Sequence, residues 1–492
     1  MPIQSRWTTL VPEISLQKWL FGSSFDPLPD YPTFIDADQP ERVLSFSDFR
    51  LWSKKIGLGL QNAGLKLGDR VLLLSGNHIL FPSVFIGVLM AGGIVTGASP
   101  AFTPRELAYQ LRDSEAAFLI VAPDLVATSM EAAKLAGLPI SQIFVFDDAA
   151  AGTPGAAEQG SSGTTGAPKG VEITHYGVPD HVFGELPQDG DPDIHHADVQ
   201  LQADAPAYST LQNHAACGRT AHHQRPCHQS TEFKYDLSTV TTVGCGTAPL
   251  APNMAKEMER LWPCGEVFVR QAWGMTELTC IGSITDPAET VRTDSVGEAA
   301  PNGSIKLMDG DKEILEANTR GELWYTGPTV MKGYWCNKKA TQETITEKDG
   351  IRWLRTGDIA YVDSYQPGGK IHIVDRIKEL IKVKGFQVAP AELESLLLER
   401  DDIIDAGVVG VHNNGEEVPR AYVVKSPASK ASAKDITQWM ETRTAKYKWL
   451  TGGVVFVDSI PRVPSGKILR RVLRERAQRE TGNRNVRASK LA

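Results

Sequence analysis

The chain has 492 residues, more than one hydrophobic core usually organises, so its length predicts at least two domains. Hydrophobic residues make up 41% and charged residues 22%, which is typical of a soluble globular protein. A net charge of −8 and an isoelectric point near 5.8 argue against a surface that binds nucleic acid, although a local basic pocket for an anionic cofactor stays open. The six cysteines form no C-x-x-C pair, which favours reduced thiols in an intracellular protein over a disulfide framework.

The first half of the chain alternates short apolar runs with helical patterns. Residues 46–62 read as an amphipathic helix, and strands are expected at 71–74, 118–121 and 143–146. Strands separated by helices imply a parallel sheet that helices cover on both faces. We therefore expect an α/β architecture over this part of the chain.

The most apolar stretch of the chain, residues 71–95, is not expected to cross a membrane. Asn77, His78 and Pro82 interrupt it, so it reads as a buried strand followed by a core helix. The N-terminal residues 1–7 also lack the apolar run of a signal peptide. These features predict a cytoplasmic protein without a membrane span.

A peroxisomal location stays open as an alternative. Residues 489–491 read Ser-Lys-Leu, which is a peroxisomal address only at the end of a chain, and Ala492 follows them here.

Residues 161–170, with the sequence SSGTTGAPKG, have the composition of a phosphate-binding loop. Glycines let backbone N–H groups approach a phosphate closely, hydroxyls add donors, and a lysine supplies a point charge. The spacing differs from the Walker-type G-x-x-x-x-G-K-[ST] loop, and such clusters are also common in plain loops. The candidate ligand residues are Ser161, Ser162, Gly163, Thr164, Thr165, Gly166, Lys169 and Gly170.

Residues 177–230 differ from the rest of the chain. They contain seven of the eleven histidines and no lysine, and no strand or helix period is present. A shifted reading frame, a splicing difference or disorder would explain this composition. A metal site is the alternative, but the spacings fit no standard zinc arrangement. It would draw on His195, His196, His214, Cys217, His222, His223, Cys227 and His228.

Regular patterns return after residue 235. Strands are expected at 240–243 and 266–269, with a helix at 253–261 between them. Residues 321–375 predict short strands joined by frequent turns, including turns at 349–350 and 367–369 and a last strand at 371–374.

The C-terminal part predicts a smaller α+β unit. A basic stretch at 376–384 precedes a helix at 391–398, and an Arg-rich helix at 468–479 ends the pattern. We place a domain boundary near Asp375, which gives an N-terminal domain over 1–374 and a C-terminal domain over 375–492.

Four further segments accompany the loop at 161–170: residues 271–277, 355–358, 375–385 and 464–467. Together and in this order, the five segments resemble the superfamily of adenylate-forming enzymes. That group comprises acyl- and aryl-CoA ligases, the adenylation domains of peptide synthetases, and beetle luciferases. The stretch KGFQVAPAELE at 384–394 is most similar to 4-coumarate–CoA ligases, and the chain also resembles acyl-CoA ligases of fungal secondary metabolism.

The resemblance implies a fold and a reaction. The fold is α/β, with a large N-terminal domain of layered sheets and helices and a small α+β C-terminal lid domain. The reaction is ATP- and Mg²⁺-dependent activation of an aromatic or medium-chain carboxylic acid to acyl-AMP and pyrophosphate, followed by formation of the coenzyme A thioester. The small-molecule partners are therefore an acid, ATP and coenzyme A, and a carrier protein or a downstream synthase stays open.

The resemblance also assigns the nucleotide-binding residues. The loop at 161–170 would hold the β- and γ-phosphates of ATP, and Asp358 and Arg376 would contact the ribose, or for Arg376 the phosphates. The remaining assignments are Gly246, Thr247 and Ala248 beside adenine, Trp273 packing on the base, Thr276 on the α-phosphate, and Glu277 on Mg²⁺ through a hard carboxylate oxygen. Gly274 is a further residue assigned to cofactor binding.

Two lysines carry the implied catalysis. Lys467, after the turn Pro464-Ser465-Gly466, would bridge the carboxylate and the α-phosphate as negative charge develops, a role that suits a point charge. Rotation of the lid about a hinge near Asp375 or Lys378 would then bring Lys382 to Gly385 to the site for the attack by coenzyme A.

Two alternatives to the CoA ligase stay open. The same adenylation could load a carrier protein, although no carrier domain adjoins the chain. The chain could also be an inactive nucleotide-binding remnant, because residues 177–230 replace the segment that lines the acyl pocket in the family.

Overall fold

The computed structural model divides into two compact units, the first of residues 11–179 and 332–338, the second of residues 1–10, 180–331 and 339–492. The predicted domain boundary near Asp375 lies inside the second unit and stays a prediction. The structure describes residues 2–145 (except 12, 24–25 and 37–38), 171–172, 240, 243–246, 250, 252–262, 267–286, 289, 293–413, 416–427, 429–462 and 467–489.

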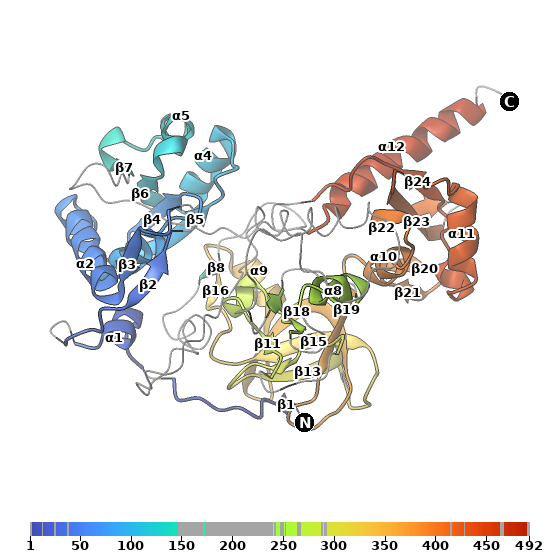
Figure 1. Cartoon of the computed structure of the whole chain (residues 1–492), viewed down its shortest axis with the longest axis horizontal. Coiled ribbons are helices and arrows are strands. Elements are labelled where there is room, and N and C mark those ends of the chain that lie inside the picture. The colour runs from blue at the N-terminus through green and yellow to red at the C-terminus, as the bar shows by residue number, and fades with distance from the viewer. Residues whose placement is uncertain are drawn as a thin grey trace. The chain divides into compact units, whose positions relative to one another are not determined.

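A parallel sheet forms the centre of the first unit (Figure 1). Its strands stand in the order β5-β4-β6-β7, and each pairs in parallel with its neighbour. The predicted strands and the parallel pairing are confirmed, whereas β5 was not expected, because it follows a helix inside one continuous apolar stretch. The strands are β4 (Arg70–Leu74), β5 (Ile94–Ala98), β6 (Ala116–Val121) and β7 (Ile143–Val145).

Helices cover both faces of this sheet, as the sequence predicts. Val71 and Leu73 face a cluster with α2 (Phe46–Asn62) and α3 (Phe81–Met90), whereas Leu72 and Leu74 face α4 (Pro104–Asp113) and α5 (Val126–Ala136). Successive strand residues point to opposite faces, so an unbroken apolar run is what a sheet buried on both sides requires.

Two glycines let α2 and α3 approach each other closely. A Cβ on Gly87 would lie 2.7 Å from Cγ2 of Ile56 and 2.9 Å from the carbonyl oxygen of Ser53. A Cβ on Gly57 would lie 2.9 Å from the carbonyl oxygen of Gly87. The helix pair therefore depends on the absence of side chains at this crossing.

Short elements complete the first unit. They are α1 (Leu16–Phe21), the antiparallel pair of β2 (Pro32–Ile35) and β3 (Val43–Ser45), the antiparallel pair of β8 (Val171–Glu172) and β16 (Gly333–Tyr334), and 3₁₀ turns at Pro123–Leu125 and Ile140–Gln142.

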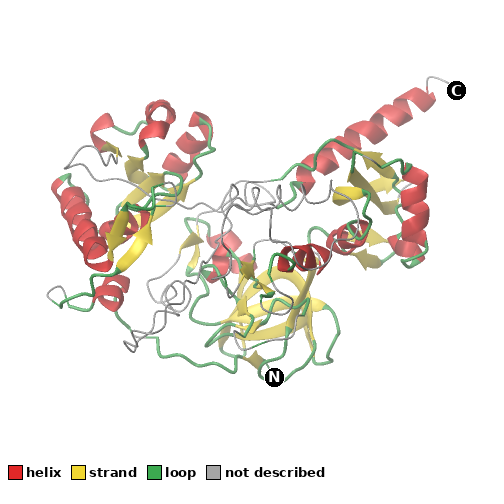
Figure 2. Ribbon diagram, viewed as in Figure 1, coloured by secondary structure: helices red, strands yellow, loops and turns green. Residues whose placement is uncertain are grey.

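An antiparallel sheet of seven strands organises the N-terminal part of the second unit (Figure 2). The order is β1-β13-β15-β18-β17, with β14 paired to β13 and β19 paired to β18. The strands are β1 (Ile3–Gln4), β13 (Ser304–Asp309), β14 (Lys312–Ile314), β15 (Gly321–Thr326), β17 (Ile345–Lys348), β18 (Ile351–Val362) and β19 (Ile371–Arg376).

The expectation of only short strands in this region is wrong for β18, which runs for twelve residues. Gly357, with φ of +70°, and a register shift between Ile359 and Ala360 bend the strand without ending it. The predicted turn at 349–350 is confirmed: Asp349 and Gly350 both have positive φ, as a tight hairpin between β17 and β18 requires.

Two parallel strands, β9 (Val243–Cys245) and β10 (Val269–Gln271), flank α8 (Pro252–Glu259). β10 begins at Val269, the last residue of the strand predicted at 266–269, so that prediction was about three residues too early. Val243, the last residue of the strand predicted at 240–243, belongs to β9, and residues 241–242 lie outside the described part of the chain. The pair of β11 (Ser283–Ile284) and β12 (Glu298–Ala299), a 3₁₀ turn at Thr276–Leu278, and α9 (Lys338–Thr344) complete this region.

The C-terminal part is α+β. It contains a three-stranded sheet in the order β22-β23-β24. Side chains of this sheet form one hydrophobic cluster with α10 and α11 and a second hydrophobic cluster with α12. The last helix begins two residues later and ends ten residues later than predicted. The elements are β20 (Ile381–Val383), β21 (Phe386–Val388), α10 (Pro390–Leu397), β22 (Ile403–Asn413), β23 (Glu416–Lys425), α11 (Ala433–Glu441), a 3₁₀ turn at Lys446–Lys448, β24 (Val454–Phe456) and α12 (Arg470–Ser489).

These elements confirm the predicted α/β class with a smaller α+β part at the C-terminus. Among the described residues, no helix combines the length and the apolar composition that crossing a membrane requires.

The glycine crossing of α2 and α3 predicts a specific loss of stability. Gly87→Leu should lower the free energy of unfolding by about 1–3 kcal/mol, because the added side chain must displace Ile56 or the α2 backbone. Gly76→Leu is the matched control, since a Cβ there meets no atom within 4 Å. Equal midpoints of urea unfolding for the two variants would contradict the packing argument.

Candidate functional site

The parallel pair of β9 and β10 brings two predicted segments together. Parallel strands end at the same sheet edge, so the residues after Cys245 meet the residues after Gln271. The N–H of Ala272 donates to the carbonyl oxygen of Cys245 over 2.9 Å, and the N–H of Leu250 donates to Oε1 of Gln271 over 3.1 Å. Gly246 lies exposed at this edge.

Trp273 lies two residues after the end of β10, and its side chain is buried. Its backbone N–H donates to Oγ of Ser283 over 3.1 Å, and its indole N–H donates to Oδ2 of Asp358 over 2.8 Å. Gly274 leaves no room for a side chain, because a Cβ there would lie 1.7 Å from the carbonyl oxygen of Cys280. The local backbone thus fixes the indole ring so that its N–H points toward Asp358.

Asp358 stands in β18 and is only 3% exposed. Its backbone N–H donates to Oγ1 of Thr356, which itself donates to the carbonyl oxygen of Leu323. Nε of Arg376 lies 3.1 Å from Oδ1 of Asp358. Burial raises the pKa of Asp358, while the charge of Arg376 and the hydrogen bond from Trp273 oppose that rise.

Arg376 ends β19 directly opposite Asp358 in the ladder with β18. Its side chain is 36% exposed, so the guanidinium holds the buried carboxylate and still reaches solvent. The preceding residue, Asp375, is fixed by two backbone donors: the N–H of Arg376 over 2.7 Å and the N–H of Ala391 over 3.0 Å. The segment that carries Arg376 is therefore tied to the start of α10.

Thr276 and Glu277 lie in the 3₁₀ turn that follows Trp273, and both are partly exposed. The N–H of Met331 donates to the carbonyl oxygen of Glu277 over 2.8 Å, and the next side chain, Leu278, is fully buried. These two anchors hold the turn while the polar side chains at 276 and 277 remain accessible.

Lys467 belongs to the same group. Burial and the positive charge of Arg376 lower its pKa, and the carboxylates of Asp358 and Glu277 oppose that shift. The structure thus brings Lys467, Arg376, Asp358 and Glu277 within electrostatic reach of one another. Glu379 is a third carboxylate that acts on Lys467, and Trp273 donates a hydrogen bond to the most buried of the three, Asp358.

Lys382 and Gly385 lie elsewhere, on the exposed hairpin of β20 and β21. The backbone N–H of Lys382 donates to Oε2 of Glu417, and Gly385 has φ of +87°. In the described part of the chain, no hydrogen bond or ion pair joins either residue to Asp358 or Lys467.

The other predicted ligands are outside the described residues. They are Ser161, Ser162, Gly163, Thr164, Thr165, Gly166, Lys169 and Gly170 of the phosphate loop, together with Thr247 and Ala248. The histidines and cysteines of the metal alternative are outside them too. The described residues contain no cluster of three His, Cys, Asp or Glu side chains that could hold a metal ion.

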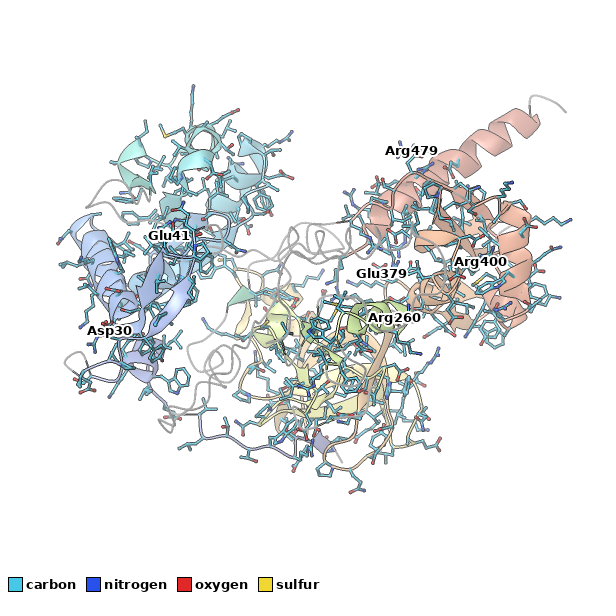
Figure 3. The ribbon with its side chains drawn as sticks, in the orientation of Figure 1. Asp30, Glu41, Arg260, Glu379, Arg400 and Arg479 are labelled. Carbon is cyan, nitrogen blue, oxygen red and sulfur yellow. The ribbon has the colours of Figure 1, made fainter. Side chains whose placement is uncertain are left out.

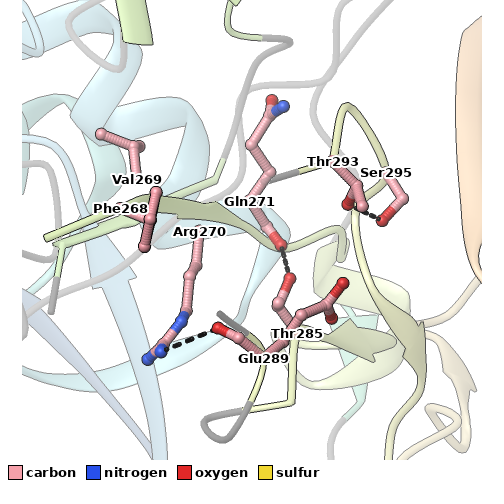
Figure 4. Close-up of a pocket in the computed structure, with 8 residues that line it drawn as sticks. All are labelled: Phe268, Val269, Arg270, Gln271, Thr285, Glu289, Thr293 and Ser295. Atoms are coloured by element: carbon pink, nitrogen blue, oxygen red, sulfur yellow. Dashed lines mark hydrogen bonds between the residues drawn. The ribbon is translucent and has the colours of Figure 1, made fainter. Parts of the chain in front are cut away.

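Gln271 and Thr356 were not expected from the sequence as site residues. Gln271 joins the two strand ends, and Thr356 orients the backbone of Asp358. Gln271 also lines a small pocket, together with Arg270, Thr285 and other residues. Figure 4 shows the side chains of Gln271 and Arg270 on opposite sides of β10. Gln271 and Thr356 lie inside the predicted segments 271–277 and 355–358, and this was the signal that the sequence offered.

Comparison with known proteins supports the resemblance. The sequence pattern described as AMP-binding enzyme matches residues 24–212 and 207–335, and the AMP-binding enzyme C-terminal domain matches 392–467. The acyl-CoA synthetase ACTT5 of Alternaria alternata is 36% identical over 92% of this chain and 89% of its own length. The phenylacetyl-CoA ligase epaB of Aspergillus niger is 33% identical over 95% of this chain and 97% of its own length.

A solved structure shares the fold. The crystal structure of the anthranilate CoA ligase AuaEII in complex with anthranoyl-AMP aligns with a TM-score of 0.73 and 21% identity, over 90% of this chain and 94% of that one.

The bond between Trp273 and Asp358 predicts a difference between two tryptophan variants. Trp273→Phe removes a donor from a buried carboxylate, whereas Trp353→Phe removes an indole N–H that makes no hydrogen bond in the described residues. Both changes remove the same volume from a buried site. Trp273→Phe should therefore lower the free energy of unfolding by about 1–3 kcal/mol more than Trp353→Phe does. Denaturant titration measures this difference, and equal losses would show that the bond contributes nothing.

Proposed function

Because the chain belongs to the AMP-binding enzyme family, we propose that it is an ATP-dependent acid–CoA ligase. In the first step, a carboxylate oxygen of the acid bonds to the α-phosphorus of ATP, and the bond from that phosphorus to pyrophosphate breaks. In the second step, the sulfur of coenzyme A bonds to the acyl carbon, the thiol proton is released, and AMP leaves.

The group of Asp358, Arg376, Glu277 and Lys467 is the observation that carries this proposal. Asp358 would accept hydrogen bonds from the ribose hydroxyls, and Trp273 and Arg376 hold its oxygens in place for that task. A carboxylate that approaches a triphosphate meets strong repulsion, so cations must stand where the two anions meet. Arg376 and Lys467 supply those charges, and Thr276 would donate to the α-phosphate.

Glu277 fits a magnesium ion. Mg²⁺ is usually held in proteins by one or two carboxylates together with phosphate oxygens of the substrate, and it retains some of its water. Glu277 is one partly exposed carboxylate, and it directly follows Thr276, the residue that would donate to the α-phosphate. The ion would offset phosphate charge, while Glu277 would fix its place next to Lys467.

The hairpin of β20 and β21 would serve the second step. Lys382 and Gly385 are exposed, and they follow Asp375 and Lys378, the predicted hinge. Rotation at the hinge would withdraw Lys467 and present this hairpin to the acyl-adenylate. Glycine at 385 allows the positive φ that this position of the hairpin tip adopts.

An aromatic acid is the substrate class that we propose first. The relative from Aspergillus niger is named as a phenylacetyl-CoA ligase, and the structural neighbour as an anthranilate CoA ligase. Medium-chain acids are the second class, and a role in fungal secondary metabolism is consistent with the relatives from Alternaria and Aspergillus.

Acid-dependent exchange of labelled pyrophosphate into ATP tests the first step. A panel of benzoic, phenylacetic, cinnamic and C6 to C10 acids should contain at least one acid that supports exchange, and chelation of Mg²⁺ should abolish it. Thioester formation on adding coenzyme A would then separate the CoA ligase from an enzyme that loads a carrier protein. Absence of exchange with every acid would instead favour an inactive nucleotide-binding remnant.

Variants of the two lysines should affect different steps. Lys467→Ala should reduce exchange by at least about 100-fold, because it removes a charge that stabilises the transition state. Lys382→Ala should leave exchange nearly intact and slow thioester formation from supplied acyl-AMP. Lys339→Ala, at a side chain that is 89% exposed, is the matched control and should change neither step. Exchange that survives Lys467→Ala would refute the assigned role.

A further inference from the structure

Arg470 lies three residues after Lys467, at the first position of α12, and its side chain is only 11% exposed. Nε of Arg470 is 2.6 Å from Oε2 of Glu379, and Nη2 donates to Oε2 of Glu394 over 3.0 Å. Nη1 donates to the other oxygen of Glu394. One guanidinium therefore contacts two carboxylates, and it holds one of them with two bonds.

This triad is buried. The side chains of Glu379 and Glu394 are 11% and 9% exposed. Burial raises the pKa of Glu394, whereas the charge and the bonds of Arg470 oppose the rise, and the N–H of Val408 also donates to Glu394. Asp375 is the further acidic group near Glu394 and Arg470, and Arg474 lies 3.6 Å from Glu379. Removing Arg470 would leave two buried carboxylates without their main partner, which is costly.

The triad connects the predicted hinge, helix α10 and the segment that carries Lys467. Glu379, labelled in Figure 3, comes directly after Lys378 of the predicted hinge, and its N–H donates to the carbonyl oxygen of Arg376. Glu394 belongs to α10. Arg470 belongs to the segment that carries Lys467. The backbone that holds Arg376 and the backbone that holds Lys467 are thus joined through one buried ion cluster.

Backbone hydrogen bonds hold the two residues that follow Lys467 in place. Ile468 forms a β-bridge with Arg462, and the N–H of Leu469 donates to the carbonyl oxygen of Pro461 over 2.8 Å. Arg462 is held in turn by Asp405 over 2.7 Å. These bonds fix the strand direction at 468–469, and Arg470 attaches this segment to both the hinge and α10. Arg474 also contacts the hinge, where it donates to the carbonyl oxygen of Lys378 over 3.4 Å.

We propose, on the basis of the proposed function, that Arg470 is the positioning residue for Lys467, and that its ion triad with Glu379 and Glu394 sets where that lysine stands relative to Arg376. Lysine could not replace it, because a single ammonium cannot reproduce the planar fork that reaches both carboxylates. The triad holds Lys467 for adenylation and contributes nothing to the later attack by coenzyme A.

Arg471 offers a matched control. It is the neighbouring arginine on α12, its side chain is 70% exposed, and it pairs with Glu475 one turn along the helix. Arg470→Ala and Arg471→Ala therefore change the net charge equally at adjacent positions. Glu379→Gln provides a milder disruption of the triad that keeps the side-chain volume.

The kinetic test compares the two half-reactions. Arg470→Ala, Arg470→Lys and Glu379→Gln should slow pyrophosphate exchange, the alanine variant by about 30-fold, which lies within the range of couplings in one ion-pair network. Thioester formation from supplied acyl-AMP should remain nearly unchanged, as should both steps in Arg471→Ala. In a Lys467→Ala background, Arg470→Ala should cause no further loss of exchange. Equal losses in both half-reactions, or a further loss in that background, would overturn the proposal.

A second readout needs no catalysis and so separates this proposal from the proposed function. Acetic anhydride labels lysines according to their exposure and protonation, and mass spectrometry compares Lys467 with the exposed Lys339 in one sample. Lys467 should be labelled more slowly than Lys339 in the unchanged chain and in Arg471→Ala. It should approach the rate of Lys339 in Arg470→Ala and Arg470→Lys, which leave the carboxylate of Glu379 near Lys467 in place. Unchanged protection of Lys467 in these two variants would overturn the positioning role, whether or not the chain turns over any acid.

Discussion

The ion pair of Asp358 and Arg376 is the interaction on which the rest of the site depends. A carboxylate that is 3% exposed must have partners, and the structure supplies a guanidinium from β19 and an indole N–H from the segment after β10. Meeting this requirement fixes two neighbouring strands and the start of the Thr276–Leu278 turn in one arrangement. The nucleotide-binding residues are therefore placed by the need to stabilise one buried charge.

The regular parts of the fold were predictable because their signals are local. The apolar runs at 71–74 and 118–121 and the helical period at 46–62 depend on burial within a few residues, and the structure has these elements. The strand predicted at 266–269 begins only at Val269, because an apolar run does not show where a ladder begins. β18 was expected to be short because Gly357 reads as a turn, although pairing with both β15 and β19 carries the strand through it.

In the site, too, the sequence indicated which residues belong but not which partners they contact. Chain order and resemblance indicated Trp273, Glu277, Asp358, Arg376 and Lys467, yet no pattern indicated that Trp273 would donate to a residue 85 positions away. Arg470 was hidden among the arginines of the last helix, since burial alone separates it from Arg471. Partners of a buried charge are set by tertiary packing, and a single sequence carries little information about them. The residues of the phosphate loop lie outside the described part of the chain, so their assignment still depends on the resemblance.

The pairing of β1 with β13 has a consequence for the making of the protein. Ile3 pairs with Ile305, so the first strand leaves the ribosome long before its partner exists. At a synthesis rate of about 5–20 residues per second, the delay is on the order of 15–60 s. During that time Ile3 and Gln4 lack the strand with which they pair in the folded protein. This part of the sheet can therefore form only after residues 304–305 have been synthesised.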